Sequence, residues 1–288
     1  MNGLLVIDKP GGMTSRDAVN RVQRWFPRKT KIGHTGTLDP LATGVLVVCV
    51  GAATRLADYV QAMGKSYSSR FRFGATSTTD DADGEATETP NAPVPTREQI
   101  DAALAAFVGN VEQVPPAVSA LKLDGVRAHE LVRRGLGPKL NARVVSIYAI
   151  RVTGFAWPHL DVEVDCGKGT YIRSIARDLG DVLGCGGLVQ TLRRTRVGPF
   201  RVEQGMSLDA DPASVKLLPM AEAVAGMKHV SLNADDVARL RHGRRIRLPE
   251  NNALPEGEEL AVLDGQTGLV GIGIVERGQL KPQLVFGV

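Results

Sequence analysis

A single carboxylate, Asp39, stands in the glycine-rich segment from Gly33 to Gly44, which leads into the apolar run 45–50. Pro40 restricts Asp39 to extended conformations, and the apolar run predicts a buried strand that anchors the loop. A carboxylate held in this way can act as a nucleophile or as a general base. An isolated Asp-Pro pair more often marks a plain turn. A plain turn does not need the other polar side chains of this segment, which are His34, Thr35, Thr37 and Thr43.

A second polar group follows the alternating run 160–166, where Gly167-Lys168-Gly169-Thr170 precedes a run with the apolar spacing of a helix. This turn resembles the end of a phosphate-binding loop, but glycine rather than serine or threonine follows its lysine, so we do not expect nucleoside triphosphate chemistry. Tyr171 and Arg173 stand at the predicted start of the helix, where they could meet an anion or a carboxylate. On an ordinary first turn, both side chains would simply face solvent.

The composition bounds the class of protein. The chain has 288 residues, a formal net charge of +4 and 43% hydrophobic residues. It contains no apolar run near the length of a membrane-spanning helix and no recognisable secretory leader, so we expect a cytoplasmic protein without membrane contact. The three cysteines are far apart and form no C-x-x-C pair, which argues against a disulfide framework and against zinc. The length allows one large domain or a main domain with a smaller one.

Positive charge is concentrated in three segments, 16–31, 193–201 and 239–247, and the last two are rich in arginine. Guanidinium groups suit bidentate phosphate contacts and stacking on bases, so these segments indicate a polyanion as partner. A solvated charged surface is the alternative for each of them. The acidic segment 80–88 lacks the ligand spacing of a calcium-binding EF-hand, and we expect it to be a solvated loop.

The hydrophobic pattern supplies the strands and helices that must position these side chains. Residues 3–8 and the alternating run 67–73 predict strands, the second with Tyr67 near its beginning. The spacings Thr14-x-x-Asp17 and Thr96-x-x-Gln99 predict the starts of two helices. Near the C-terminus the pattern predicts a weak helix and two short strands, at 234–240, 259–263 and 269–275.

Six short segments, in this order, resemble the bacterial TruB family of tRNA pseudouridine-55 synthases. They are Lys9-Pro10 with the Gly-Gly-Met-Thr-Ser that follows, the Asp39 loop, Gly64 to Tyr67, Val118 to Lys122, Gly169 to Ser174 and Leu192 to Arg194. The Asp39 loop, Gly-His-Thr-Gly-Thr-Leu-Asp-Pro, is the most specific of them. The resemblance extends over nearly the whole chain.

The resemblance implies an α+β fold. A pseudouridine synthase catalytic domain with an RNA-gripping insert would occupy residues 1–226, built on a mixed, largely antiparallel sheet with flanking helices. A small PUA-like, RNA-binding β domain would occupy residues 227–288, and its arginine cluster would contact the acceptor end of tRNA. The expected partner is therefore tRNA, bound through its T arm with the acceptor stem as a further contact. No guide RNA is expected, and the protein is expected to be a monomer.

The reaction that the resemblance implies breaks the N-glycosidic bond of uridine, rotates the base and rejoins it to the sugar through C5, without an external cofactor or a metal. Asp39 would be the essential carboxylate, Tyr67 would stack on the target uracil, and Arg173 would pair with Asp39. We expect the nearby guanidinium to keep that carboxylate ionised. Whether Asp39 attacks the sugar, adds to the base or removes a sugar proton stays open.

The remaining candidates bind the substrate or support the site. By resemblance, Tyr171 lies over the reacting nucleotide and helps to remove a proton. His34 fills the space that the flipped-out base leaves in the RNA loop. Lys9 is a supporting residue, and Leu192 forms an apolar wall of the uracil pocket.

Two positions depart from the family pattern. Val118 and His129 stand where tyrosine is common in the family. Both fall in the RNA-gripping insert. We therefore expect them to alter RNA contact without touching the group formed by Asp39, Tyr67 and Arg173.

Two other functions compete with this one. A glycoside or nucleoside hydrolase also breaks a glycosidic bond, but it usually needs two carboxylates that flank the bond. Only Asp39 has such a setting here, since Asp165 lies in a predicted strand without an equivalent loop. A non-catalytic RNA-binding or tRNA-folding protein could use the same scaffold. The intact set of Asp39, Tyr67 and Arg173 argues against that alternative.

Overall fold

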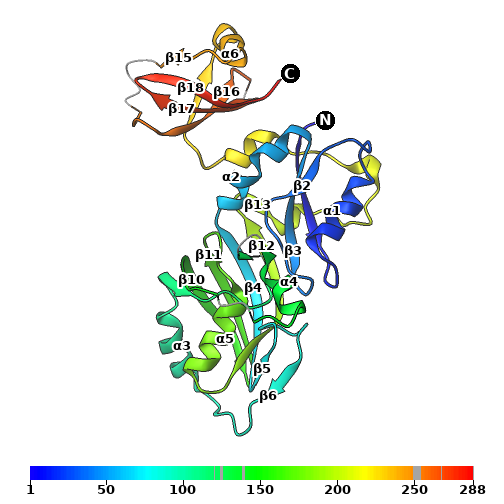
Figure 1. Cartoon of the computed structure of the whole chain (residues 1–288), viewed down its shortest axis with the longest axis vertical. Coiled ribbons are helices and arrows are strands. Elements are labelled where there is room, and N and C mark those ends of the chain that lie inside the picture. Colours follow the sequence, from blue (N-terminus) through cyan, green and yellow to red (C-terminus); the bar gives the residue numbers. More distant parts are fainter. Residues whose placement is uncertain (120, 124–125, 138–139, 249–253, 267, 288) are drawn as a thin grey trace.

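A computed structural model describes residues 1–119, 121–123, 126–137, 140–248, 254–266 and 268–287 of the chain. Two β-sheets dominate an elongated molecule (Figure 1), in which the smaller, C-terminal sheet lies at one end. This mixture of sheets and separate helices confirms the predicted α+β class. In the described part of the chain, none of the helices is long and apolar enough to cross a membrane.

The larger sheet contains nine strands in the order β1-β3-β12-β4-β11-β10-β7, with β2 beside β3 and β13 beside β12. Only the β3–β12 pair is parallel, so the predicted mixed and largely antiparallel sheet is confirmed. The strands are β1 Gly3–Lys9, β2 Ile32–His34, β3 Thr43–Val50, β4 Lys65–Phe73, β7 Gly109–Gln113, β10 Arg143–Ala156, β11 His159–Cys166, β12 Gly187–Val197 and β13 Phe200–Arg201.

The strand after the Asp39 loop is buried on both faces, which explains its uninterrupted apolar sequence. Its side chains alternate between two hydrophobic clusters, with Leu46, Val48 and Val50 in one and Val45, Val47 and Cys49 in the other. In β4, by contrast, buried Tyr67, Phe71 and Phe73 alternate with more exposed residues, as its sequence pattern predicts. The loop thus leads directly into a strand that is buried on both faces.

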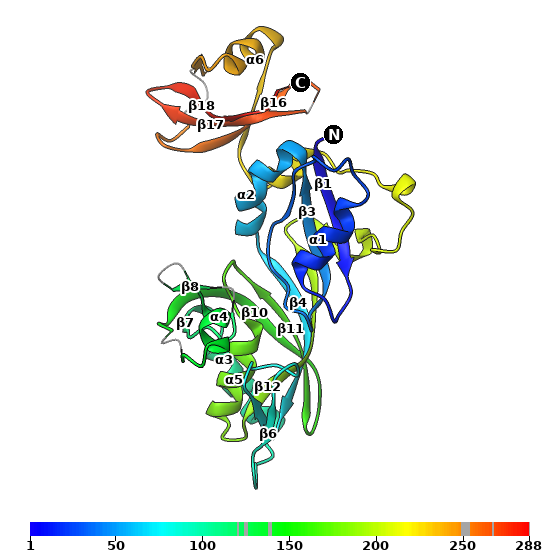
Figure 2. The same cartoon turned by 45° about the vertical axis from the view of Figure 1, so that its right-hand side comes forward.

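Both predicted capping boxes are present. Thr14 caps α1 (Ser15–Gln23) together with Asp17, and Thr96 caps α3 (Arg97–Ala105) together with Gln99. Helix α5 (Ile172–Val182) follows the glycine turn and packs against β12 and α3, on one side of the sheet (Figure 2). The shorter elements are α2 Ala57–Ala62, α4 Ala128–Arg133, and the small strand pairs β5 Ala75–Ser77 with β6 Ala86–Glu88 and β8 Lys122–Leu123 with β9 Val126–Arg127.

The C-terminal sheet has five strands in the order β14-β16-β17-β18-β15. Its elements are β14 His229–Leu232, α6 Ala234–Arg241, β15 Ile246–Arg247, β16 Glu259–Asp264, β17 Leu269–Glu276 and β18 Gln279–Val285. The predicted helix and both predicted strands are therefore present. Phe286 joins a hydrophobic cluster with Ala53 and Leu56, and the Arg55 guanidinium lies 5.4 Å from the centre of its ring. The division of the chain at residues 226 and 227 stays a prediction.

Gly44 closes the Asp39 loop under a strong steric constraint. Its φ is +98°, and a Cβ there would lie 2.2 Å from the carbonyl oxygen of Arg194 on the neighbouring strand. We expect Gly44→Ala to lower the free energy of unfolding by roughly 3 kcal/mol or more, because backbone strain and a backbone clash act together. Chemical denaturation measures this loss.

Gly33→Ala is the matched control at the other end of the segment. A Cβ at Gly33 would have no atom within 4 Å, so its substitution should cost less than roughly 1 kcal/mol. An equal loss of stability in the two variants would contradict this account of the loop.

Candidate active site

A pocket of about 350 Å³ opens beside the Asp39 loop and the first turn of α5. Five of the seven candidate residues line it, namely Asp39, Tyr67, Tyr171, Arg173 and Leu192. They come from distant parts of the chain and meet because β12 pairs with both β3 and β4. Its volume is in the range of small-ligand sites.

The centre of the pocket is an ion pair. Nη2 of Arg173 lies 2.9 Å from Oδ2 of Asp39. The Arg173 side chain is 5% exposed, whereas that of Asp39 is 35% exposed. The Arg173 guanidinium is therefore buried. The Asp39 carboxylate is the member of the pair that a ligand in the pocket can reach.

Arg173 binds a second carboxylate, Asp81. The expectation that segment 80–88 is solvated is therefore wrong for Asp81, whereas residues 82, 83 and 85–88 are exposed as expected. Nη1 of Arg173 lies 3.2 Å from Oδ2 of Asp81, a residue whose side chain is 4% exposed. The same Nη1 donates to the carbonyl oxygen of Thr79 at 2.7 Å, and the Thr79 hydroxyl donates to Asp81 at 2.6 Å. A buried arginine needs such partners, and the acidic loop supplies them.

Asp81 is a second carboxylate near Asp39, but it does not support the hydrolase alternative. It is not among the residues that line the pocket, and its carboxylate is occupied by Arg173, Thr79 and the N–H of Asp83. Two carboxylates that flank a glycosidic bond must both reach it. Of these two, only Asp39 faces the pocket.

The pKa of Asp39 differs from the sequence-based expectation. Burial raises the pKa of its carboxyl above the usual range, and Arg173 offsets this effect only in part. The negative charges of Asp81 and Asp83 raise the pKa further. Arg173 favours the ionised form, as expected from the sequence, but desolvation has the larger effect on the pKa. The carboxylate is consequently more basic than that of an ordinary aspartate.

Val118 is closer to this group than expected. Its carbonyl oxygen accepts a hydrogen bond from Nη2 of Arg173 at 3.1 Å, so the prediction that it does not touch the catalytic set was wrong. The contact uses the backbone, which valine and tyrosine share. His129 lies in α4, and its side chain is outside the part of the structure that is described.

Lys9 acts on the backbone of the loop and does not line the pocket. Its side chain is completely buried, and Nζ donates to the carbonyl oxygens of Met13 at 2.8 Å, Pro10 at 2.9 Å and Pro40 at 3.4 Å. Burial lowers the pKa of this ammonium group to about 8. One buried amine therefore ties the Asp39 loop to the chain that leads into α1.

Arg194 also binds the backbone of the loop, a role that the sequence did not reveal. Its side chain is buried, and it donates to the carbonyl oxygens of Val45 at 2.7 Å and Gly36 at 3.1 Å. Neighbouring Arg193 and Arg196 pair with Asp8 and Asp165. These three arginines thus hold protein segments together, and the interpretation of this cluster as a phosphate-binding surface stays a prediction.

Gln113 fixes the first turn of α5. The sequence did not predict this role. Its Oε1 accepts from the N–H of Tyr171 at 2.8 Å, and its Nε2 donates to the carbonyl oxygen of Tyr171 at 3.1 Å. Tyr171 is the N-cap of α5, so this clamp fixes the backbone that carries Tyr171 and Arg173. A lone glutamine at the end of a strand gives no sequence signal for such a role.

Tyr67 and His34 have different settings. Burial raises the pKa of the Tyr67 phenol, so this ring enters the pocket as a neutral group. His34 ends β2, opposite Val48 in β3, and is only partly buried. It is not among the residues that line the pocket.

The sheet has the fold of pseudouridine synthases. The solved "Structure of H/ACA RNP bound to a substrate RNA containing 2'-deoxyuridine" matches this chain with a TM-score of 0.74, at 23% sequence identity, over 99% of this chain and 85% of that one. The "Crystal Structure of a Cbf5-Nop10-Gar1 Complex" gives a TM-score of 0.74 at 24% identity, over 99% of this chain and 84% of that one. These likenesses concern the fold alone.

Sequence comparison identifies the family. Residues 24–172 match the "TruB family pseudouridylate synthase (N terminal domain)", residues 173–211 the "tRNA pseudouridylate synthase B C-terminal domain", and residues 229–286 the "Pseudouridine synthase II TruB, C-terminal". The tRNA pseudouridine synthase B of Xanthomonas campestris pv. campestris (strain 8004) is 41% identical over 295 residues, which cover 99% of this chain and 94% of the relative. That of Thermobifida fusca (strain YX) is 44% identical over 281 residues, or 93% and 96%. The chain belongs to the TruB family, whose enzymes isomerise uridine to pseudouridine in tRNA.

The raised pKa of Asp39 has a consequence for stability. A carboxyl whose pKa is higher in the folded state lowers stability as pH rises through that pKa, so the ionised group costs free energy at neutral pH. Asp39→Asn should therefore melt at the same or a higher temperature than the wild type at pH 7. Differential scanning calorimetry measures this.

Asp81→Asn is the contrasting variant. It leaves the buried Arg173 with a weaker partner and should lower the free energy of unfolding by roughly 3 kcal/mol. Destabilisation by Asp39→Asn as large as that by Asp81→Asn would contradict the division of roles between the two carboxylates.

Proposed function

We propose that the chain isomerises uridine 55 in the T loop of tRNA, with Asp39 as its catalytic carboxylate. The observation that carries this proposal is the accessible Asp39 carboxylate, held 2.9 Å from the buried Arg173 in a pocket that Tyr67 and Tyr171 also line. The target base must leave its stack to enter such a pocket, so the substrate nucleotide is flipped out.

Asp39 has the properties that bond rearrangement at the sugar requires. Its elevated basicity suits attack on C1′, addition to the base or removal of a sugar proton. In each case the N1–C1′ bond breaks, the C5–C1′ bond forms, the proton on C5 leaves to solvent and N1 takes up a proton from solvent. Product and substrate are therefore isomers, so no external oxidant, reductant or cofactor is needed.

The other candidates divide between holding the base and holding the loop. Tyr67 offers a neutral aromatic face and Leu192 an apolar wall, which suit a planar uracil. Tyr171 reaches the reacting nucleotide from the start of α5, where it assists the loss of a proton. His34 lies outside the pocket, a place compatible with filling the gap that the flipped base leaves in the RNA loop. Lys9 supports Asp39 through the loop backbone.

The remaining proposals concern the partner. Residues 1–226 form the catalytic domain with its RNA-gripping insert, and residues 227–288 form a PUA-like domain that contacts the acceptor stem. The protein recognises the T arm of tRNA directly, without a guide RNA, and works as a monomer in the cytoplasm. The exposed Arg241 and Arg244 in and after α6 support a phosphate contact by the C-terminal domain.

The release of tritium from a tRNA transcript labelled at C5 of uridine tests the reaction. The wild type should release it without added metal or nucleotide. Asp39→Asn should bind the transcript but lose roughly four orders of magnitude or more in rate, because the reacting group is missing. Unchanged turnover in this variant would refute the proposal.

The pH dependence of single-turnover tritium release tests the ionised form of Asp39. Activity should fall as the pH drops through the raised pKa of Asp39, so the acidic limb should lie above the ordinary aspartate value of about 4. Arg173→Met should move this limb to a still higher pH, because it removes the charge that opposes the shift. A limb that does not move would show that another group controls it.

Substitution of C-terminal arginines tests the acceptor-stem contact in the full chain. Arg241→Gln with Arg244→Gln should weaken binding of a complete tRNA transcript and reduce its salt dependence by about one unit for each lost phosphate contact. The same substitutions should leave the affinity for an isolated T-arm hairpin unchanged. Equal weakening of both RNAs would place the contact elsewhere.

A further inference from the structure

The exposed face of α1 and the turn after it carry a cluster of cations that the proposed reaction does not use. We call this the α1 basic face and define it by its residues Arg16, Arg24, Arg28, Lys29 and Lys31, all of which are exposed. Within the described part of the chain, none of the five has a carboxylate at ion-pair distance. Arg21, on the same helix, does have one, at 3.0 Å in Asp209.

Other exposed arginines in the catalytic region form ion pairs within the protein. Arg70, Arg97 and Arg151 are also exposed, and each pairs with an acidic side chain on the same or a neighbouring element. Uncompensated like charges repel one another and weaken the folded state, so a cluster of them indicates a partner of opposite sign. The α1 basic face differs in this respect from these three paired arginines.

The start of α1 is tied directly to the catalytic loop. The Ser15 hydroxyl donates to the carbonyl oxygen of Leu38 and accepts from its N–H, at 3.0 and 2.8 Å. The N–H of Gly12 donates to the carbonyl oxygen of Pro40 at 2.9 Å. The helix then runs for nine residues, or about 13 Å, away from this point. An RNA strand with one nucleotide in the pocket can therefore continue along α1.

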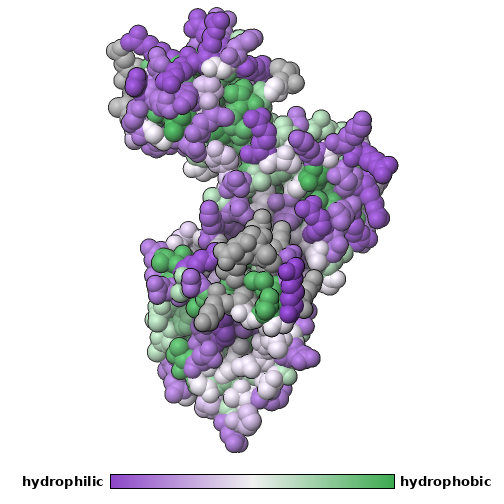
Figure 3. All heavy atoms as spheres, in the orientation of Figure 1, coloured by the Kyte–Doolittle hydropathy of each residue, from purple (hydrophilic) through white to green (hydrophobic). Residues whose placement is uncertain are grey.

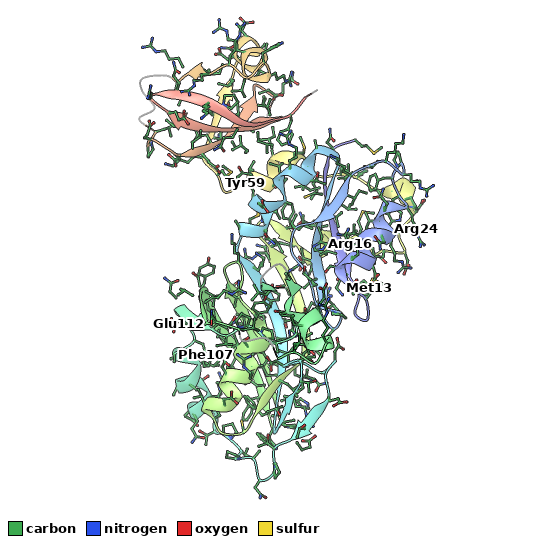
Figure 4. The ribbon with its side chains drawn as sticks, in the orientation of Figure 1. Met13, Arg16, Arg24, Tyr59, Phe107 and Glu112 are labelled. Carbon is green, nitrogen blue, oxygen red and sulfur yellow. The ribbon has the colours of Figure 1, made fainter. Side chains whose placement is uncertain are left out.

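The figures agree with this placement. Figure 4 shows Arg16 and Arg24 along α1, with Arg24 toward the outer edge of the molecule and Met13 at the other end of the helix. Figure 3 shows hydrophilic side chains along the same edge. The basic residues thus lie on and after a helix whose start is hydrogen-bonded to the Asp39 loop.

We propose that the α1 basic face binds the sugar-phosphate backbone of the substrate RNA outside the nucleotide that enters the pocket. The inference rests on the proposed function, because that function places RNA at the start of α1. RNA fits better than an acidic protein, since guanidinium forks match phosphate geometry and the surface continues a site for a nucleotide. Contacts of this kind position the substrate and add affinity that depends on salt.

The test uses a triple variant of the full chain, Arg24→Gln, Arg28→Gln and Lys31→Gln, and a tRNA transcript as probe. Its dissociation constant is measured between 50 and 200 mM salt, a range over which phosphate contacts change affinity strongly. We expect binding to weaken roughly tenfold or more at the low end and the salt slope to fall by about two to three. Thermal melting verifies that the variant is folded.

A double variant with Arg97→Gln and Arg151→Gln is the matched control, because these exposed arginines are paired with carboxylates. It should bind RNA with the affinity and salt slope of the wild type. An unchanged salt slope in the triple variant, or an equal loss in the control, would overturn the proposal.

Tritium release by the wild type separates this result from the proposed function. If the wild type is inactive but the triple variant still loses affinity and salt slope, the isomerase proposal fails and the α1 basic face stands. If the wild type is active and the triple variant binds as the wild type does, the α1 basic face is refuted alone.

Discussion

The site depends on one guanidinium that is shared between two carboxylates. Arg173 joins Asp39, on the loop between β2 and β3, to Asp81, on the loop between β5 and β6. The buried member, Asp81, balances the charge of the arginine, and the accessible member, Asp39, is left at the pocket. Because desolvation dominates at Asp39, the pair produces a basic carboxylate and not a passive salt bridge.

The rest of the structure holds this arrangement still. Lys9 binds the carbonyl oxygen of Pro40 and Arg194 that of Gly36, at two points of the Asp39 loop, and Gln113 clamps the turn that carries Arg173. All three polar side chains make these hydrogen bonds to main-chain atoms. Removal of these side chains would leave buried carbonyl or N–H groups without partners. This cost explains why several polar residues bind the backbone of one short loop and of the neighbouring turn.

Local signals in the sequence predicted much of the fold. The caps at Thr14 and Thr96 and the alternation in β4 depend on neighbours a few residues away, so they could be read directly. The roles of Asp81 and Arg194 could not. The Asp81 contact spans 92 residues of chain and the Arg194 contacts span 149 and 158 residues. By composition alone, an acidic loop and an arginine cluster both resemble solvated surface. The resemblance to a family identified the pocket residues and Lys9, but not the supporting roles of Asp81, Gln113 and Arg194.

The central claim is that one pocket, through Asp39, isomerises a single uridine of tRNA. Carbodiimide labelling followed by primer extension maps pseudouridine at single-nucleotide resolution and tests this claim most directly. The account predicts one new stop, at uridine 55 of an unmodified transcript treated with the wild type, and none with Asp39→Asn. A stop at uridine 55 with the Asp39→Asn protein, or its absence with the wild type, would contradict it.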